Sequence, residues 1–78
     1  MPTLDRIIRE ALELDESVEL TSLAYRETAE WDSVAHLSLL TALEEAYGFE
    51  LEPDELMAMT DYAGVRRVIE RRTRHDGP

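Results

Sequence analysis

The sequence predicts an all-α protein, a small four-helix bundle of three longer helices and one short helix. Three observations predict it. Apolar residues recur with the helical period of 3.6 residues in separate segments, no segment alternates with period two for long enough to make a sheet, and 78 residues allow one domain with one modest core. The chain has no cysteine, so this core must stabilise the fold alone. We expect residues 1–73 to form the domain and residues 74–78 to be a frayed tail.

The first helix is predicted to begin at Leu4, with Thr3 as its N-cap. One side of its helical wheel is charged and the other is apolar. The apolar side consists of Leu4, Ile7, Ile8, Ala11 and Leu14. From residue 15 to residue 31 the periodicity fails, and we expect a long loop between the first two helices. It is pinned to the core by Leu20, Leu23, Tyr25 and Trp31. A loop this long either counts against the assignment or indicates a functional segment.

The second helix is predicted over residues 33–47. Gly48 ends it, because glycine adopts the left-handed C-terminal conformation without a steric penalty. Its inward stripe consists of Leu39, Leu40, Leu43, Ala46 and Tyr47. The opposite side carries an exposed strip that begins with an apolar residue and consists of Val34, Ser38, Thr41 and Glu45.

Two more helices are predicted near the C-terminus. Residues 53–59 form a short one, with proline in its first turn and acids near its positive end. Thr60 is expected to cap the last helix, whose C-terminal half is rich in arginine. Its buried face consists of Tyr62, Val65, Val68 and Ile69. Gly64 inside this helix costs about 1 kcal/mol relative to alanine, which indicates a close contact between helices.

The charge is strongly acidic, since 18 acidic residues and 8 arginines give a formal net charge of −10. Such a chain repels nucleic-acid phosphates, which excludes nucleic acid as a partner. Between Arg26 and Arg66 there are ten acidic residues and no basic one. This distribution fits a surface that keeps the protein soluble and equally fits an acidic docking face for basic partners. No apolar run is long enough to span a membrane, and the N-terminus lacks a secretion signal, so we expect a cytoplasmic protein without membrane contact.

Motifs for catalysis or metal binding are not found. A nucleophilic serine would need a base, and the only histidines are His36 and His75. We interpret His36 as a structural histidine packed at the end of the bundle and bonded to the loop. The chain has no glycine-rich phosphate loop, EF-hand or zinc motif, and its clustered carboxylates are interpreted as a solvated face. We therefore expect a protein that is not itself an enzyme and holds no metal.

Asp32 and Ser33 begin the second helix. Both residue types cap helices, an effect of about 1 kcal/mol, so the pair alone indicates nothing more. A function is indicated by the combination of an exposed hydroxyl at the positive end of a helix, an apolar Val34 beside it and acidic residues around it.

The stretch WDSVAHLSLLTALEEAYGFEL resembles the second-helix region of acyl carrier proteins. The motif of that family is Asp-Ser-Leu or a close variant, followed by an apolar helix that ends in an acidic pair and an aromatic residue. The matching residues are Asp32, Ser33 and Val34, then Leu37 to Leu43, then Glu44, Glu45 and Tyr47. The resemblance extends to the chain length, the long first loop, the acidic charge and the order of helices, so it spans nearly the whole chain.

The resemblance implies that a phosphopantetheinyl transferase esterifies Ser33 with the 4'-phosphopantetheine of coenzyme A. The thiol of this group then carries acyl groups as thioesters in fatty-acid, polyketide or related biosynthesis. A phosphodiester at the first turn of a helix would also meet free N–H groups and a favourable dipole. The implied partners are acyl-loading and acyl-processing enzymes with basic docking patches, and we expect the carrier itself to be a monomer. Its recognition face would consist of Val34, Ser38, Thr41, Glu44 and Glu45.

The chain departs from the family at four positions. Glu30 and Trp31 stand where glycine and a small or aliphatic residue are frequent, and Val34 and Thr41 replace larger apolar residues. These departures argue against housekeeping fatty-acid synthesis and favour a specialised set of partners. Asp32 favours acyl over peptidyl carriers, which often have histidine there. Two alternatives stay open: an aminoacyl or peptidyl carrier, and an acidic helical adaptor that binds a basic partner without modification.

Overall fold

The computed structural model of the protein describes residues 3–73, so the tail predicted at residues 74–78 lies outside the described residues. The described chain is all-helical, as predicted. Its elements are α1 (Leu4–Ala11), the 3₁₀ helix η1 (Leu20–Ser22), α2 (Ser33–Tyr47), α3 (Pro53–Ala58) and α4 (Tyr62–Thr73). Within this range the only β-type pairing is an isolated bridge between Ala24 and Asp61. No helix of residues 3–73 is long and apolar enough to cross a membrane.

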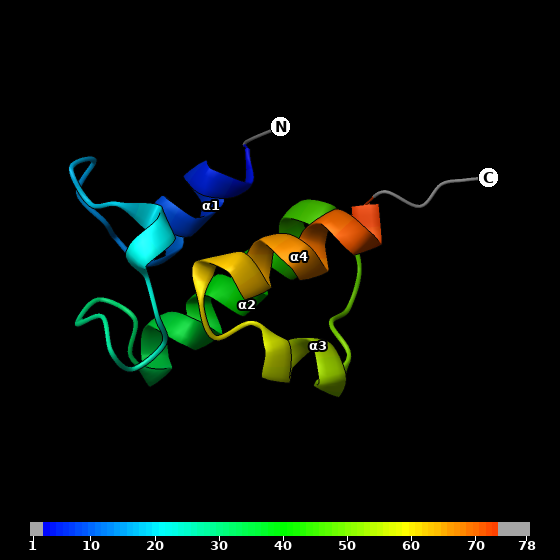
Figure 1. Cartoon of the computed structure of the whole chain (residues 1–78). Helices are drawn as coiled ribbons and strands as arrows, with labels where there is room; N and C mark the ends of the chain where they lie inside the picture. The colour runs from blue at the N-terminus through cyan, green and yellow to red at the C-terminus, as the bar shows by residue number, and fades with distance from the viewer. Residues whose placement is uncertain (1–2, 74–78) are drawn as a thin grey trace.

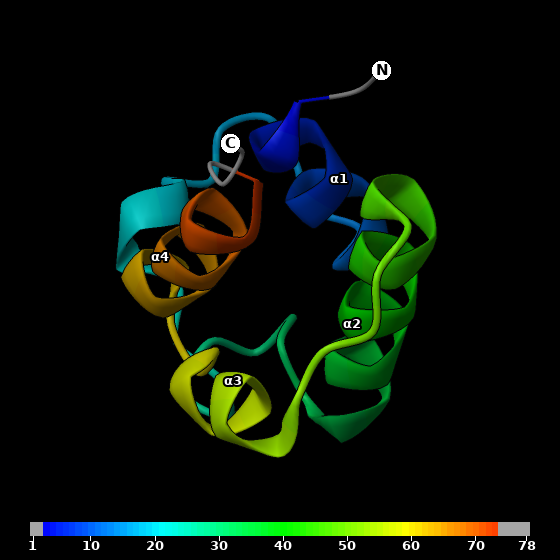
Figure 2. The same cartoon turned by 90° about the vertical axis from the view of Figure 1, so that its right-hand side faces the viewer.

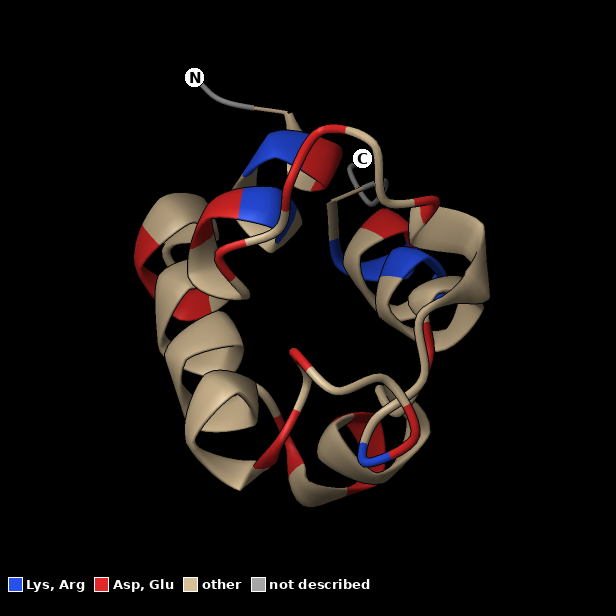
Figure 3. Ribbon diagram, turned by 90° about the vertical axis from the view of Figure 1, so that its left-hand side faces the viewer, with Lys and Arg blue, Asp and Glu red and all other residues tan. Residues whose placement is uncertain are grey.

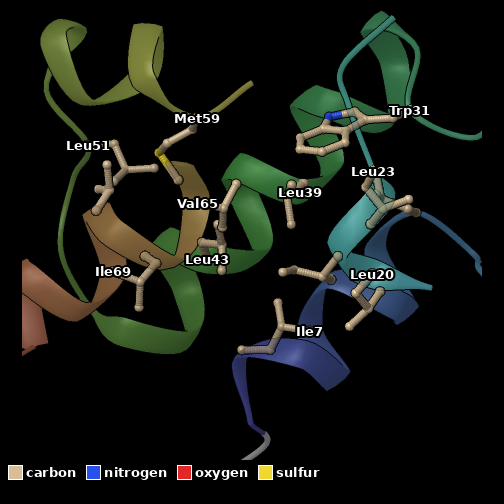
Figure 4. Packing of buried hydrophobic residues seen from close by; sticks show 13 residues of the cluster. Ile7, Leu20, Leu23, Trp31, Leu39, Leu43, Leu51, Met59, Val65 and Ile69 are labelled. Atoms are coloured by element: carbon tan, nitrogen blue, oxygen red, sulfur yellow. The ribbon is translucent and has the colours of Figure 1, made fainter. Parts of the chain in front are cut away.

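The four α-helices surround one hydrophobic core (Figures 1 and 2). Figure 2 shows α1 between α4 and α2, with α3 on the opposite side of the centre. The loop between α1 and α2 contributes three buried side chains to the core, Leu20, Leu23 and Trp31. Figure 4 shows Trp31 beside Leu23 and Leu39, whereas Met59 and Leu51 lie at the α3 end of the core. The expected pinning of the loop is therefore confirmed, with Tyr25 half-buried.

Helix α1 ends earlier than predicted. It stops at Ala11, so Leu14 lies beyond it and is only half-buried, while Leu12 at the C-cap is buried. The N–H of Glu13 bonds the carbonyl of Glu10, and the N–H of Leu14 bonds the carbonyl of Arg9 at 2.9 Å. This is the Schellman ending of a helix. Glu13 takes the left-handed position at φ 56°, which glycine usually occupies, so the helix stops without a local sequence signal.

Helix α2 has the bounds that the sequence predicts. Asp32 is its N-cap, and Gly48 ends it at φ 76°. Its stripe faces the core as expected, with Leu39 and Leu43 fully buried and Leu40, Ala46 and Tyr47 partly buried.

The start of α4 differs from the prediction. Asp61, rather than Thr60, caps the helix, because its Oδ1 accepts a hydrogen bond from the N–H of Gly64 at 2.7 Å. The carbonyl of Thr60 instead accepts the N–H of Tyr25 at 2.8 Å. The predicted close approach at Gly64 is confirmed, since a Cβ there would lie 2.0 Å from the carbonyl oxygen of Ala58.

Glu55 of α3 is buried and is not part of a solvated acidic face. Arg72 of α4 donates from one nitrogen to both of its carboxylate oxygens, at 2.8 and 2.9 Å. Arg72 also bonds the carbonyl of Glu50, and its guanidinium lies 4.3 Å from the centre of the Phe49 ring. One ion pair therefore joins α3, α4 and the segment between α2 and α3. The hydrogen bond from the backbone of Glu52 and the neighbouring Arg72 hold the pKa of Glu55 below its usual range.

Candidate functional site

Ser33 is the first residue of α2, and its side chain is exposed. The residue before it, Asp32, has extended backbone angles, and its Oδ1 accepts a hydrogen bond from the N–H of Ala35 at 2.9 Å. The carbonyl of Asp32 accepts the N–H of His36 at 2.8 Å and closes the first turn. The aspartate therefore acts as a helix cap, and the cap fixes where the serine hydroxyl lies.

The surroundings of the Ser33 hydroxyl suit an anionic substituent. The N–H groups of the first turn of a helix have no acceptor within the helix, and here the Asp32 side chain occupies the one at Ala35. The N–H groups of Ser33 and Val34 belong to the same turn, at the positive end of a helix of 15 residues. A phosphodiester on the Ser33 oxygen is therefore compatible with the residues present.

Tyr25 lies beside the serine, and its ring is linked to His36 and Trp31. The Tyr25 hydroxyl is 3.3 Å from the Ser33 Oγ, and the Tyr25 ring stacks on His36 with ring centres 4.4 Å apart. The Nε1–H of Trp31 donates to Nδ1 of His36 at 2.9 Å, so the neutral imidazole carries its proton on Nε2. Burial lowers the pKa of His36. The expected bond between this histidine and the loop is present.

Exposed apolar side chains follow Ser33 on α2. Val34 is 73% exposed and Leu37 is 66% exposed. Residues 33–43 carry no charge, and Figure 3 shows the corresponding part of α2 without red or blue segments. Met57 on α3 is also exposed, at 79%. The sequence predicts an exposed Val34 but does not predict the exposure of Leu37 and Met57. The spacing of three residues from Val34 could have placed Leu37 on the exposed side.

The other predicted recognition residues divide into two groups. Ser38, Thr41 and Glu45 are exposed. Glu44 is half-buried, and its Oε2 accepts the N–H of Leu51 at 2.8 Å, so it braces the segment after α2. Of the acidic pair, Glu45 is the carboxylate that is free to meet a partner from solvent.

No group of histidine and acidic side chains in residues 3–73 is arranged to hold a metal ion. No protein-family model matches the chain, and neither a curated protein nor a solved structure is significantly similar to it.

Proposed function

We propose that the protein is a cytoplasmic, monomeric acyl carrier of the four-helix-bundle type, with a 4'-phosphopantetheine arm on Ser33. The observation that carries the proposal is the exposed Ser33 hydroxyl at the first position of α2, capped by Asp32. This hydroxyl lies within the stretch that resembles acyl carrier proteins. The proposed pathways are fatty-acid, polyketide or related biosynthesis.

In the attachment reaction the chain itself contributes the serine hydroxyl and its surroundings, and the transferase contributes the catalysis. In the transferase, the Ser33 oxygen attacks the phosphorus next to pantetheine, the Oγ–P bond forms and the P–O–P bridge of coenzyme A breaks. Adenosine bisphosphate leaves, and the hydroxyl proton passes to a base of the transferase. When bound, the group supplies the thiol that this cysteine-free chain lacks. The chain presents the hydroxyl, and the N–H groups of the first turn that Asp32 leaves free would favour the resulting anion.

The recognition face in this proposal runs along α2 from the serine. Val34 and Leu37 provide apolar contact next to the arm, while Ser38, Thr41 and Glu45 continue the exposed strip. Glu44 contributes charge from its half-buried position. Acidic side chains steer the protein toward basic patches on acyl-loading and acyl-processing enzymes. Such steering raises the association rate and weakens with salt, which suits a carrier that must dissociate again.

Intact mass spectrometry tests the proposal. The protein is incubated with coenzyme A, magnesium and a broad-range phosphopantetheinyl transferase, with a known carrier as a positive control. We expect the wild type to gain one phosphopantetheinyl group, Ser33→Ala to gain none, and Ser22→Ala, which removes an exposed hydroxyl of η1 outside the recognition face, to react like the wild type. A folded wild type whose mass stays constant while the control carrier reacts would refute the proposal.

A second candidate, an unmodified acidic adaptor, is favoured by the ten acidic residues between Arg26 and Arg66. The Ser33→Ala variant separates the two functions. An adaptor should keep its basic partner after this substitution, whereas a carrier should stay folded and lose all cargo transfer. An aminoacyl or peptidyl carrier would also be modified on Ser33 and would differ in the enzyme that loads its thiol.

A further inference from the structure

The loop segment before α2 is closed by its own hydrogen bonds. The carbonyl of Ala24 accepts the N–H groups of Glu27 and Thr28, and the N–H of Ala24 donates to the Thr28 hydroxyl at 3.0 Å. The N–H of Arg26 bonds the carbonyl of Trp31 at 2.8 Å. Arg26 has φ 69°, an uncommon conformation for a residue other than glycine. Residues 24–31 therefore form a tight, specified turn within the loop.

This turn is also fixed to the rest of the fold. The N–H of Tyr25 bonds the carbonyl of Thr60 at 2.8 Å, beside the bridge between Ala24 and Asp61. At the other end of the turn, the Trp31 side chain is completely buried. Tyr25 is thus held through its backbone on one side and through the buried Trp31 on the other.

A stack of rings directs the Tyr25 side chain toward α2. Trp31 holds His36 through its indole N–H, and His36 in turn stacks on the Tyr25 ring. The Tyr25 ring also meets the Trp31 ring edge-on, with centres 6.4 Å apart. The outer end of this stack is the Tyr25 hydroxyl, which lies 3.3 Å from the Ser33 Oγ. Core packing alone does not require this contact, because both groups are at the surface.

We propose that the Tyr25 hydroxyl is the chain's own hydrogen-bond donor to the group attached to Ser33, and that Trp31 and His36 are its positioning residues. This inference rests on the proposed function. Before modification, either hydroxyl can be the donor. Esterification removes the proton of the Ser33 oxygen, so Tyr25 must then donate. A phosphodiester offers anionic oxygens, and hydrogen bonds to charged acceptors are the stronger kind. Tyr25 therefore restrains the root of the arm against the loop.

Phosphorus NMR of the modified protein tests this directly, because it observes the attached group without any enzymatic activity. Three proteins are compared: the wild type, Tyr25→Phe, which keeps the ring stack and loses the hydroxyl, and Tyr47→Phe. Tyr47 is a matched control, since its ring stacks on Phe49 at the other end of α2. The modified protein unfolded in urea gives the reference position of the phosphorus resonance when the attached group makes no contact with the fold. The indole proton of Trp31 reports whether its bond to His36 is intact.

We expect the phosphorus resonance of Tyr25→Phe to move from the wild-type position toward the unfolded position and to relax more slowly, with the Trp31 indole proton unchanged. Tyr47→Phe should match the wild type. Coincident phosphorus resonances and relaxation in all three folded proteins would overturn the role of Tyr25 and leave the carrier function standing. A wild type that the transferase does not modify would instead refute the carrier function.

If Tyr25→Phe shifts the indole proton, His36→Gln serves as the second variant. It keeps an acceptor for Trp31 and loses the ring on which Tyr25 stacks, so it should shift the phosphorus resonance in the same direction, and an unshifted resonance would count against the stack.

Discussion

The ion pair between Glu55 and Arg72 leads to the sharpest prediction for stability. The Glu55 side chain is 6% exposed and that of Arg72 is 27% exposed, with nitrogen and oxygen 2.8 Å apart. The next residue, Arg71, provides a matched control, because its side chain is 71% exposed and its nitrogen is 4.0 Å from the same carboxylate. Replacing each arginine by methionine removes one charge and keeps most of the aliphatic stem.

The expected loss follows from what remains around the carboxylate. Removing one partner of a buried ion pair costs about 3 to 5 kcal/mol. Here the cost is reduced, because Arg72 is partly exposed and Glu55 keeps the N–H of Glu52 at 2.8 Å. We expect Arg72→Met to lower the free energy of unfolding by about 2 to 3 kcal/mol, and Arg71→Met by less than about 0.5 kcal/mol. For a domain of this size, the first loss corresponds to a decrease in Tm of about 10 to 20 °C.

Urea denaturation followed by circular dichroism measures both variants. The pKa of Glu55 is lowered in the folded protein, so its contribution to stability is present above the ordinary carboxyl pKa and is lost as the pH falls through the lowered value. The difference between wild type and Arg72→Met should therefore shrink in acid. Adding Glu55→Gln to Arg72→Met should recover part of the loss, because no unpaired charge then remains buried. Equal losses for the two arginine variants at neutral pH would show that Arg72 has no special role in stabilising the buried carboxylate.

Three further predictions concern single residues. Asp32→Ala should lower the free energy of unfolding by about 1 kcal/mol, because the helix cap is lost, and Asp32→Asn should lower it by less. Urea denaturation measures both variants, and equal losses for the two would argue against a capping role of Asp32. Gly64→Ala should cost about 2 to 3 kcal/mol in thermal unfolding, because its Cβ would lie 2.0 Å from the Ala58 carbonyl oxygen. At Gly48 an added Cβ meets no atom, so Gly48→Ala should cost only the strain of the left-handed conformation, about 1 kcal/mol. A loss of stability at Gly48 larger than that at Gly64 would contradict the close packing at Gly64. The pKa of His36 is lowered in the folded state, so the free energy of unfolding should decrease as the pH falls from about 6.5 toward the lowered value. His36→Gln should lack this decrease, and an identical pH dependence in both proteins would exclude His36 as its source.

Helix α2 could be predicted to the residue because every local signal agrees there. Asp32 caps its start, Gly48 ends it, and the apolar stripe between them has the helical period. Helix α1 could not be predicted as well, because Glu13 adopts the left-handed conformation that sequence patterns associate with glycine. Thr60 and Asp61 are both of residue types that cap helices, so the local pattern does not decide between them, and the bond from the N–H of Tyr25 to the carbonyl of Thr60 joins segments that are distant in sequence.

The sequence could predict only those parts of the candidate site that depend on residues close together in the chain. Ser33 and Val34 follow from the helix start and from the exposed strip. The contact of Ser33 with Tyr25 could not be predicted, because it joins α2 to a loop without periodicity. The pairing of Glu55 with Arg72 joins residues 17 positions apart, so the sequence indicated only the favourable position of each charge in its own helix. Tertiary contacts of this kind have no sequence period to reveal them.

Attachment of the arm to Ser33 is tested most directly by locating the modification within the chain. After treatment with transferase and coenzyme A, the protein is digested and the peptide that contains α2 is fragmented in the mass spectrometer. We predict that the phosphopantetheinyl group is on Ser33 alone, with Ser38 of the same helix unmodified. A group on any other residue, or an unmodified peptide from a folded protein under conditions where a control carrier reacts, would rule out Ser33 as the attachment site.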